Sequence, residues 1–583
     1  MQMIRDIRKE RIPLLAIFLL ACAVRFYGIG FGLPHTECRP DESSLVFKAL
    51  SFFSGDFNPH FFNYPTLYMY VLWVIYGVYL LCRFIVGLST SDMLLEVAIA
   101  PGDFFLISRI LSALMGSATV VVVYLLARRL TDRKTALLAG FFTSVSYLHV
   151  RDSHFGVTDV SMTCLAMGAM AFIMACDDTP NARNYSLAGV CTGLAASTKY
   201  AGGLLVLPMI YVHLARHIQD RTSISNEGGR RFALWAVARA AVCALKHRLI
   251  WRYGLFAGVF FLAFTPFALL DFATFVADFR YEIQHLAFGH AETVIERGWW
   301  YHARYTLPYG MGWPLFLSAL AGMGIYARKD ATRALGLFLF PLALYTLAGR
   351  GYTVFVRYMV PVVPFLCISA AIFAVYVSDA LTRHANWKGV IPVVAAVIAA
   401  QSLYRSVRFD HIMASTDNRV IAADWIVRNL PTGSTIYQAG GIWGQVQLPW
   451  ALESLQKAYG EMRRQGRRGR LLKVKMAHLR QTGGEGGYRR WEYEGQNALP
   501  EAMLPGYVII QESPLRAYSR VPQPIAQAVE VHYRLKKMFH AANFSSERNC
   551  YDQQDAFYVP YAGFTGIERP GPNIHIYERS NSR

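Results

Sequence analysis

The chain has 583 residues, of which 54% are hydrophobic and only 17% are charged, and its formal net charge is +19. Its mean hydropathy is positive. This composition excludes an ordinary soluble globular protein and places the chain in a membrane. The positive charge does not identify a nucleic-acid partner, because Lys and Arg also collect in the cytoplasmic loops of membrane proteins and near anionic lipid.

Apolar segments of spanning length follow one another through the first two thirds of the chain. The charged residues 1–11 lead directly into the first segment, which we interpret as a signal anchor and not as a cleaved signal peptide. The segments lie at 12–33, 64–88, 104–127, 135–150, 159–176, 185–198, 200–216, 252–270, 313–327, 332–348, 354–378 and 389–404.

Basic clusters fix the direction in which these segments cross. The clusters lie at 5–11, 128–134, 216–252, 328–333 and 383–388. All of them fall on the cytoplasmic side only if one early segment does not cross. We assign this role to 64–88, because its proline and tyrosines suit an interfacial helix, with a true span as the open alternative. The sequence then predicts about eleven crossings and a cytoplasmic N-terminus.

Three longer segments fall on the opposite, extracytoplasmic face with this topology. They are the loops 33–103 and 271–312 and everything after about residue 405. The cytoplasmic loop 217–250 is basic, and we expect an interfacial helix there. Reactive residues are therefore sought on the extracytoplasmic face.

The composition becomes polar after residue 404. Short β-like runs occur at 434–437, 507–511 and 574–577, between helical stretches. We therefore expect an α-helical polytopic membrane protein with a transmembrane domain at 1–404 and an extracytoplasmic soluble α/β domain at 405–583.

The nine cysteines are scattered, mostly within apolar segments. They lack the Cys or Cys/His spacing of a zinc site or a disulfide framework, so we expect no structural zinc. Cys38 and Cys550 lie in extramembrane stretches on one predicted side, where a disulfide could join them, but two separate thiols are the favoured expectation.

The first outer loop opens with adjacent acidic residues at a membrane boundary, Asp41 and Glu42, after Pro40. Such carboxylates are unfavourable there unless they are solvated, paired or used in function. A helix start accounts for part of this pattern, since acids at a helix N-terminus favour the helix dipole. This explanation suits Glu42 better than Asp41, so we favour a functional role for the pair.

A second acidic cluster follows on the same predicted side. Arg151 and Asp152 are readily explained as an ion pair in a polar outer turn. Asp159 instead begins the next apolar span, where an unpaired carboxylate is strongly disfavoured. Lys199 lies at another predicted outer turn, where its ammonium group suits a phosphate at headgroup depth, and snorkelling to the interface explains it equally well.

Further polar and aromatic residues occupy the later outer segments. The loop 271–312 contains Glu282 and His285 among histidines, arginines and tryptophans, which suit either an interfacial belt or a sugar-phosphate site. Arg357 and Tyr358 precede two prolines at the outer end of another span. Transport would place such groups near the midplane of the membrane, so their position at one face favours an interfacial enzyme.

An ordered set of these motifs resembles a known enzyme group. The set comprises Pro40-Asp41-Glu42, Asn58-Pro59-His60, Tyr64-Pro65-Thr66-Leu67, Arg109, His149 to Asp159, Thr198-Lys199-Tyr200, and Arg357-Tyr358 with Pro361 and Pro364. It is similar to the GT-C glycosyltransferases, and more narrowly to the superfamily of protein O-mannosyltransferases and lipid A aminoarabinose transferases, over about the first 405 residues. The chain departs from that group at Tyr64-Pro65-Thr66-Leu67, where relatives often have Lys-Pro-Pro-Leu or His-Pro-Pro-Leu.

The resemblance implies roles for the site residues. Asp41 would be the catalytic general base on the acceptor hydroxyl, with Glu42 supporting it, and Asp159 would be the second-loop carboxylate. Lys199, with Arg357 or Tyr358, would hold the donor phosphate. Glu282 and His285 lie where the family places further donor or acceptor contacts.

The resemblance also implies the reaction and its setting. The donor would be a polyprenyl-phosphate-linked sugar, such as a hexose like mannose, and the acceptor a hydroxyl of a protein, lipid or glycan. No cofactor is required, and a divalent cation is left open. We expect a prokaryotic plasma membrane enzyme, surrounded by membrane lipids and without a nucleic-acid partner. A transporter of lipid-linked or small solutes and a non-catalytic membrane scaffold are the alternatives.

Overall fold

The structure, a computed structural model, describes residues 2–222, 242–290, 293–385, 389–464, 469–483, 486–493, 495, 501–544 and 546–580. Two compact units make up the chain. The first comprises Met1–Phe26, Lys48–Trp73 and Arg109–Arg408, and the second comprises Tyr27–Phe47, Val74–Ser108 and Phe409–Arg583. The interfacial helix expected at 217–250 lies largely outside the described residues, and the domain boundaries at 1–404 and 405–583 stay a prediction.

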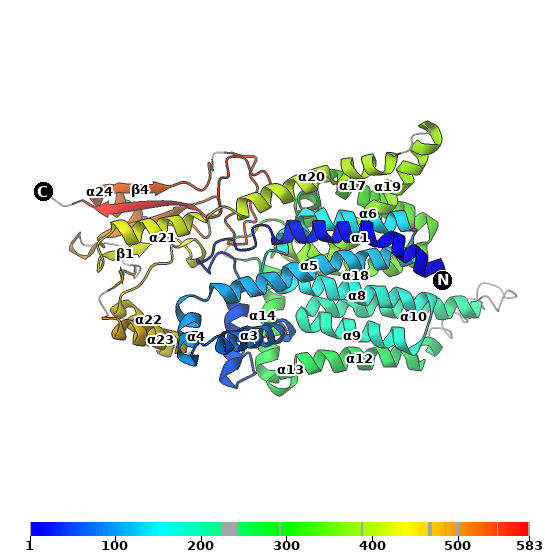
Figure 1. The fold of residues 1–583 in the computed structure, drawn as a ribbon, viewed down its shortest axis with the longest axis horizontal. Coiled ribbons are helices and arrows are strands. Elements are labelled where there is room, and N and C mark those ends of the chain that lie inside the picture. The colour runs from blue at the N-terminus through cyan, green and yellow to red at the C-terminus, as the bar shows by residue number, and fades with distance from the viewer. Residues whose placement is uncertain are drawn as a thin grey trace. The chain divides into compact units, whose positions relative to one another are not determined.

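The first unit is a bundle of long helices (Figure 1). They are α1 (Gln2–Phe26), α5 (Gly102–Leu130), α6 (Arg133–Val145), α8 (Thr158–Asp178), α9 (Ala182–Thr198), α10 (Val206–Thr222), α12 (Arg248–Phe264), α17 (Trp313–Lys329), α18 (Ala331–Gly349), α19 (Val363–Ala385) and α20 (Val390–Met413). Further helical elements connect them: α7 (Tyr147–Asp152), η2 (Tyr200–Leu205), α13 (Phe267–Leu270), α14 (Phe272–Phe288), α15 (Gly298–Tyr301), η3 (His302–Thr306), α16 (Leu307–Met311) and η4 (Val356–Val362). Each of the twelve apolar segments identified in the sequence contributes to a helix, including α3 (Leu67–Ile85).

Glycines bring α9 and α12 into close contact. The helices α8, α9, α10 and α12 run side by side in Figure 1, and α9 packs against both α8 and α12. A Cβ atom at Gly189 would lie 2.5 Å from the backbone oxygen of Tyr253, and one at Gly193 would lie 2.5 Å from that of Ala257. These two glycines are four residues apart on one face of α9, so their missing side chains allow the backbones to approach, as is common between membrane helices.

Seven helices in the described part of the chain are long and apolar enough to cross a membrane. An eighth results if Gly298–Met311 and Trp313–Lys329, which are bent by 114°, count as one broken span. The shorter apolar helices α6, α9 and α12 have 13, 17 and 17 residues. The helix α3 also meets the criteria of length and apolarity, so the interfacial placement of 64–88 stays a prediction.

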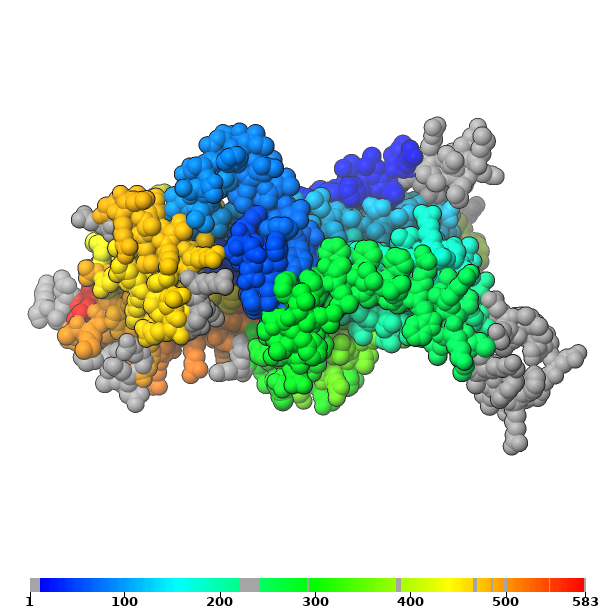
Figure 2. Space-filling model, turned by 90° about the horizontal axis from the view of Figure 1, so that it is seen from below, coloured from blue at the N-terminus to red at the C-terminus, as the bar shows by residue number. Residues whose placement is uncertain are grey.

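The outward face of α12 carries large apolar side chains. Trp251 is 70% exposed, Leu255 is 63% exposed and Val259 is 51% exposed. Figure 2 shows the segment around α12 to α14, in green, at the surface. Such an apolar surface is unfavourable in water and suits contact with lipid. The chain is therefore an integral membrane protein.

Arg25 faces the interior of the bundle, as its position in the first span predicts. Its side chain is fully buried. It donates hydrogen bonds to the carbonyl oxygens of Ala21 at 3.0 Å and Ser144 at 2.9 Å, and to Nδ1 of His149 at 3.0 Å. These acceptors satisfy a guanidinium group that the bilayer could not solvate.

The second unit contains a five-stranded sheet with the strand order β2-β1-β3-β5-β4. Its strands are β1 (Thr435–Gln438), β2 (Arg489–Arg490), β3 (Tyr507–Glu512), β4 (Tyr533–Phe539) and β5 (Asn573–Arg579). β1 is parallel to β2 and β3, whereas β5 is antiparallel to β3 and β4. Its helices are α2 (Glu42–Ser51), α4 (Thr90–Ile99), α21 (Asn418–Asn429), α22 (Leu452–Arg464), α23 (Arg470–Gln481) and α24 (Gln523–His532), and α2 ends in the first unit.

Apolar side chains cover both faces of this sheet. Ile436 and Ile509 pack with Ile426 of α21 in one buried cluster. Their strand neighbours point to the other face, where Val508 packs with Ile525 of α24. The small α/β region expected after residue 404 is thus confirmed.

The start of the loop 33–103 folds against the C-terminal part of the second unit. Arg39 forms a buried ion pair with Asp555, and Nε2 of His35 donates to the carbonyl oxygen of Gln445 at 2.7 Å. All nine cysteines lie in described residues, and no disulfide joins Cys38 to Cys550.

Candidate active site

An acid and a cation from different helices meet at one end of α8. Asp159 lies in the first turn of α8, and Lys199 caps the C-terminal end of α9. The ammonium group of Lys199 donates a hydrogen bond to the carboxylate of Asp159. The side chain of Asp159 is 3% exposed and that of Lys199 is 18% exposed. The ion pair therefore removes the cost of an unpaired buried carboxylate and leaves part of the cation accessible.

Two further predicted site residues lie beside this pair, on η4. Nζ of Lys199 is 5.3 Å from the centroid of the Tyr358 ring. The Tyr358 ring packs edge-on against Phe355, with the centroids 5.5 Å apart. The guanidinium carbon of Arg357 is 4.3 Å from the centroid of the same Phe355 ring. Phe355 therefore contacts a second cation, which two aromatic rings, Tyr358 and Phe355, separate from Lys199.

Phe355 also contacts the segment 271–312, which contains the predicted residues Glu282 and His285. The ring centroid of His290 is 5.0 Å from that of Phe355. Nε2 of His285, on α14, is hydrogen-bonded to Nδ1 of His290 at 2.7 Å, and one turn earlier Glu282 accepts a bond from Nδ2 of Asn63 at 2.5 Å. The structure thus connects Asp159, Lys199, Tyr358, Arg357, His285 and Glu282 through a series of side-chain contacts and the helix α14.

The segment around Asn58 to Asn63 is a part of this region whose contacts sequence reasoning missed. Nδ2 of Asn58 donates to Asp271 at 2.8 Å, and the backbone N–H of Phe62 donates to Asp278 at 2.7 Å. The hydroxyl group of Tyr200, next to Lys199, donates to the carbonyl oxygen of Phe62 at 2.8 Å. The sequence signal that could have indicated these contacts is the spacing of Asp278 and Glu282, which places both carboxylates on one face of α14.

Asp41 and Glu42 belong to the second unit. Glu42 begins α2 and is fully buried, and the carbonyl oxygen of Asp41 accepts a hydrogen bond from the N–H of Leu45 at 3.1 Å. The helix start predicted at this position is confirmed. Asp41 has a φ of 72°, in the left-handed region that few residues other than glycine adopt. Strained backbone of this kind is often retained at functional sites.

Burial raises the pKa of the nearby Glu37, while a hydrogen bond with Ser43 and the charge of Arg419 act in the opposite direction. Glu37 and Glu42 are also close enough to repel each other electrostatically, which raises this pKa further. Glu37 therefore retains its proton at a higher pH than a carboxyl group in water does.

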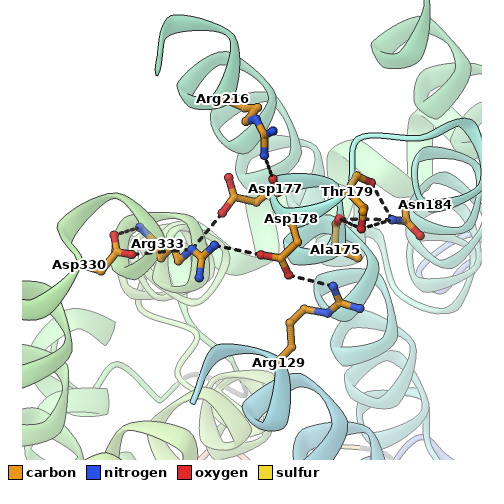
Figure 3. Close-up of polar contacts among 9 residues, drawn as sticks. All are labelled: Arg129, Ala175, Asp177, Asp178, Thr179, Asn184, Arg216, Asp330 and Arg333. Carbon is orange, nitrogen blue, oxygen red and sulfur yellow. Dashed lines mark hydrogen bonds and ion pairs between the residues drawn. The ribbon is translucent and has the colours of Figure 1, made fainter. Parts of the chain in front are cut away.

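The opposite end of α8 holds an ion-pair network (Figure 3). Arg333 bonds Asp177 at 3.0 Å and Asp178 at 2.9 Å, and Arg129 bonds Asp178 at 3.0 Å. Arg216 donates to the carbonyl oxygen of Asp177. Three of the basic clusters identified in the sequence therefore meet at this end. Because α8 has 21 residues, it separates this network from Asp159 by roughly 30 Å.

The sequence did not identify residues that would bind a divalent cation. Among the described residues, the one group of three or more His, Cys, Asp or Glu side chains close enough to hold an ion is His213, His217 and His247. None of these was a predicted site residue. The described carboxylate of Asp159 is instead paired with Lys199.

Residues 93–251 match the model of a family described as dolichyl-phosphate-mannose-protein mannosyltransferase. The resemblance inferred from the motifs is confirmed. The matched segment contains α8, α9, Asp159 and Lys199, and it excludes Asp41 and Arg357. No curated protein sequence matches the chain.

Two solved structures are similar to the chain at low sequence identity. One is the archaeal oligosaccharyltransferase AglB from Archaeoglobus fulgidus in complex with an inhibitory peptide and a dolichol-phosphate, with 12% identity and a TM-score of 0.46 over 98% of this chain and 88% of that one. The other is ArnT from Cupriavidus metallidurans bound to undecaprenyl phosphate, with 14% identity and a TM-score of 0.45 over 96% of this chain and 97% of that one. The family match covers residues 93–251 only, and these two likenesses carry no argument about function.

Proposed function

We propose that this protein is a membrane glycosyltransferase that moves a sugar from a polyprenyl-phosphate donor to an acceptor hydroxyl on the extracytoplasmic face. The observation that carries the proposal is the pairing of Lys199 with Asp159 beside Tyr358, within a segment that matches a mannosyltransferase family. The sugar is a hexose such as mannose, as that family uses.

Lys199 and Arg357 suit the phosphate of the donor. When the bond between the sugar and the phosphate breaks, negative charge develops on the departing polyprenyl phosphate. Fixed cations in a poorly hydrated site stabilise that charge more than water does. The pairing with Asp159 holds the ammonium group of Lys199 in place, and the 18% of its side chain that stays exposed allows contact with a ligand. Phe355 holds Arg357 through a cation–π contact.

The acceptor requires a general base, and we assign this role to Asp41. Its carboxylate removes the proton of the acceptor hydroxyl while the acceptor oxygen bonds the anomeric carbon and the phosphate leaves from the opposite face. The configuration of the sugar is therefore inverted. The left-handed backbone of Asp41 and the burial of Glu42 support a preorganised loop.

The arginine network supports the proposed orientation. Arg129, Arg216 and Arg333 meet at one end of α8, and Asp159 lies at the other end. Basic residues are enriched on the cytoplasmic side of membrane proteins, so this network supports an extracytoplasmic position for the Lys199 end. A prokaryotic plasma membrane is the proposed location.

Donor consumption tests this function. The full chain, purified in detergent, is mixed with radiolabelled polyprenyl-phosphate mannose and an acceptor extract of membrane glycans, lipids and proteins. We expect wild type and the control variant Lys134→Ala, which changes an exposed lysine at the arginine-rich end, to consume the donor at equal rates. Asp41→Asn should remain folded and reduce turnover by at least about 100-fold.

Wild-type activity in the Asp41→Asn variant would contradict the assignment of the base while leaving the enzyme class intact. No consumption of polyprenyl-phosphate hexose by wild type, combined with solute flux in liposomes, would instead favour the transporter. The two failures are therefore distinguishable.

A further inference from the structure

Three histidines of the first unit lie together, away from the candidate active site. His213 and His217 are one turn apart on α10, and His247 is the N-cap of α12. Their ring centroids are 4.4 Å apart for His213 and His217, 5.0 Å for His217 and His247, and 5.8 Å for His213 and His247. With one nitrogen taken from each ring, the three nitrogens all lie within 4.8 Å of one another.

The location of this histidine cluster separates it from the proposed sugar chemistry. His213 and His217 flank Arg216, which bonds the C-terminal end of α8 at Asp177. The pair formed by Asp159 and Lys199 lies at the other end of the same helix. The cluster is therefore not a part of the donor site.

Nε2 of His217 can bind a cation. Its Nδ1 is 3.0 Å from the carbonyl oxygen of His213, which can only accept a hydrogen bond, so the neutral ring carries its proton on Nδ1. The lone pair of Nε2 is then available. In metal sites, the second ring nitrogen of a ligating histidine commonly donates to a carbonyl oxygen in this way.

Nδ1 of His247 can also become a metal ligand, because the hydrogen bond that it now accepts is weak. Its Nδ1 accepts the backbone N–H of Leu249 at 3.4 Å, which is long for a hydrogen bond. A metal ion that replaced this weak contact would leave one helix N–H to be satisfied by water, as is usual in the first turn of a helix.

His213 requires an exchange of partners. Its side chain is buried, its Nε2 donates to the carbonyl oxygen of Ala244 at 2.9 Å, and its Nδ1 accepts from the hydroxyl group of Tyr185 at 2.6 Å. If the proton moves to Nδ1, that nitrogen donates to the Tyr185 oxygen and Nε2 becomes a metal ligand. The ring remains neutral, and Tyr185 then orients the ligand from the second shell of the site.

We propose that His213, His217 and His247 bind a zinc ion, with a water molecule as the fourth ligand, and that the ion fastens α10 to the start of α12. Three imidazoles suit Zn²⁺ in a tetrahedral site, whereas Ca²⁺ and Mg²⁺ require oxygen ligands. Zinc–nitrogen bonds of about 2.1 Å place the ligand nitrogens roughly 3.4 Å apart, so small rotations of the rings close the site. The expectation of no structural zinc was based on the spacing of the cysteines. It does not cover this site, because its ligands are all histidines and they come from two separate helices.

Zinc titration of the full chain tests the proposal. The protein is purified in detergent with an affinity tag that contains no histidine, stripped with EDTA, and titrated with ZnCl₂ by calorimetry. We expect one zinc ion to bind per chain in wild type. His217→Ala and His247→Ala should each lower the affinity at least tenfold, and Tyr185→Phe should lower it about tenfold by removing the orienting hydroxyl group.

His411→Ala is the matched control, because His411 is an exposed histidine outside the cluster, and it should bind zinc as wild type does. His217→Gln guards against misfolding, since glutamine keeps a hydrogen-bond donor but is a poor zinc ligand. Added zinc should raise the unfolding temperature of wild type and of His411→Ala, but not that of His217→Gln. Absence of saturable binding in wild type, or unchanged affinity in both cluster variants, overturns the proposal.

Discussion

The ammonium group of Lys199, at the C-terminal end of α9, is hydrogen-bonded to the carboxylate of Asp159, in the first turn of α8. The two residues are 40 positions apart in the sequence. Neither residue works alone in this arrangement, because the carboxylate fixes the cation and the cation stabilises the buried carboxylate.

The pair should therefore respond to mutation as one element. Lys199→Ala and Asp159→Asn are each expected to reduce kcat at least about 100-fold, since the first removes the positive charge that stabilises the leaving phosphate and the second removes the carboxylate that holds this charge in place. The double variant should be little worse than either single variant, because coupled residues are not additive. Lys199→Arg, which keeps the charge, should retain more activity. Additive losses in a steady-state assay would show that the two side chains act independently.

The contact between α9 and α12 should be sensitive to a single methyl group. Gly193→Ala places a Cβ 2.5 Å from the backbone oxygen of Ala257, so the two helices must separate. We expect the unfolding temperature in detergent to fall by several degrees. Gly258→Ala, on α12, is the control, because a Cβ there has no atom within 4 Å. That change should be neutral or stabilising by up to about 1 kcal/mol, since alanine favours helix more than glycine. Equal effects of the two changes would refute close packing at Gly193.

The arginine network at the far end of α8 should contribute modestly to stability. Arg333→Ala removes bonds to both Asp177 and Asp178, whereas Arg129→Ala removes one bond to Asp178. The Arg333 side chain is 39% exposed, so we expect a loss of only about 1 kcal/mol, larger than that for Arg129 and reduced at high salt. Arg328→Ala, which changes an exposed arginine of the same cluster, serves as the control. Thermal unfolding at low and high ionic strength provides the measurement, and a loss that does not depend on salt would argue against an electrostatic contribution.

The stability of the second unit should depend on the protonation of His35. Burial lowers the pKa of His35 from 6.5 to about 4, and the charge of Arg419 adds to this effect. Between these pH values the unfolded chain binds a proton that the folded chain does not. The contribution of neutral His35 to the free energy of unfolding is therefore complete above about pH 6.5. As the pH falls toward 4, up to roughly 3 kcal/mol of this free energy is lost.

The variant His35→Gln isolates this effect, because it does not titrate. The raised pKa of Glu37 acts in the opposite direction and is present in both proteins, so the difference between their unfolding free energies is the quantity to measure. We expect the advantage of wild type over His35→Gln to shrink as the pH falls from 6.5 to 4. A difference that stays constant over this range would contradict a buried neutral imidazole.

The helices were largely predictable because long apolar segments have few alternatives in a membrane. All twelve apolar segments contribute to helices. The runs at 434–437, 507–511 and 574–577 correspond to β1, β3 and β5, whose buried side chains make a visible pattern. The strands β2 and β4 were missed because their side chains are mostly exposed, so their sequences carry no apolar signal.

The candidate site was predictable as a set of residues but not as a set of contacts. Asp159 and Lys199 each stood out as a charge beside an apolar segment, and the pairing of Arg151 with Asp152, at 2.9 Å, is confirmed. The bond between Asp159 and Lys199 depends on how α8 and α9 pack, which single-residue patterns do not encode. Phe355 connects Tyr358, Arg357 and His290, yet an aromatic residue near an apolar segment gives no functional signal.

The ion pair between Arg39 and Asp555 has a consequence for biosynthesis. The two residues are 516 positions apart, so the ribosome completes the loop that carries Asp41 long before it reaches the carboxylate that neutralises Arg39. Until then this ion pair cannot form. The contact between the loop and the C-terminal region therefore forms only in a nearly finished chain, and a prematurely terminated polypeptide that lacks residue 555 would lack it.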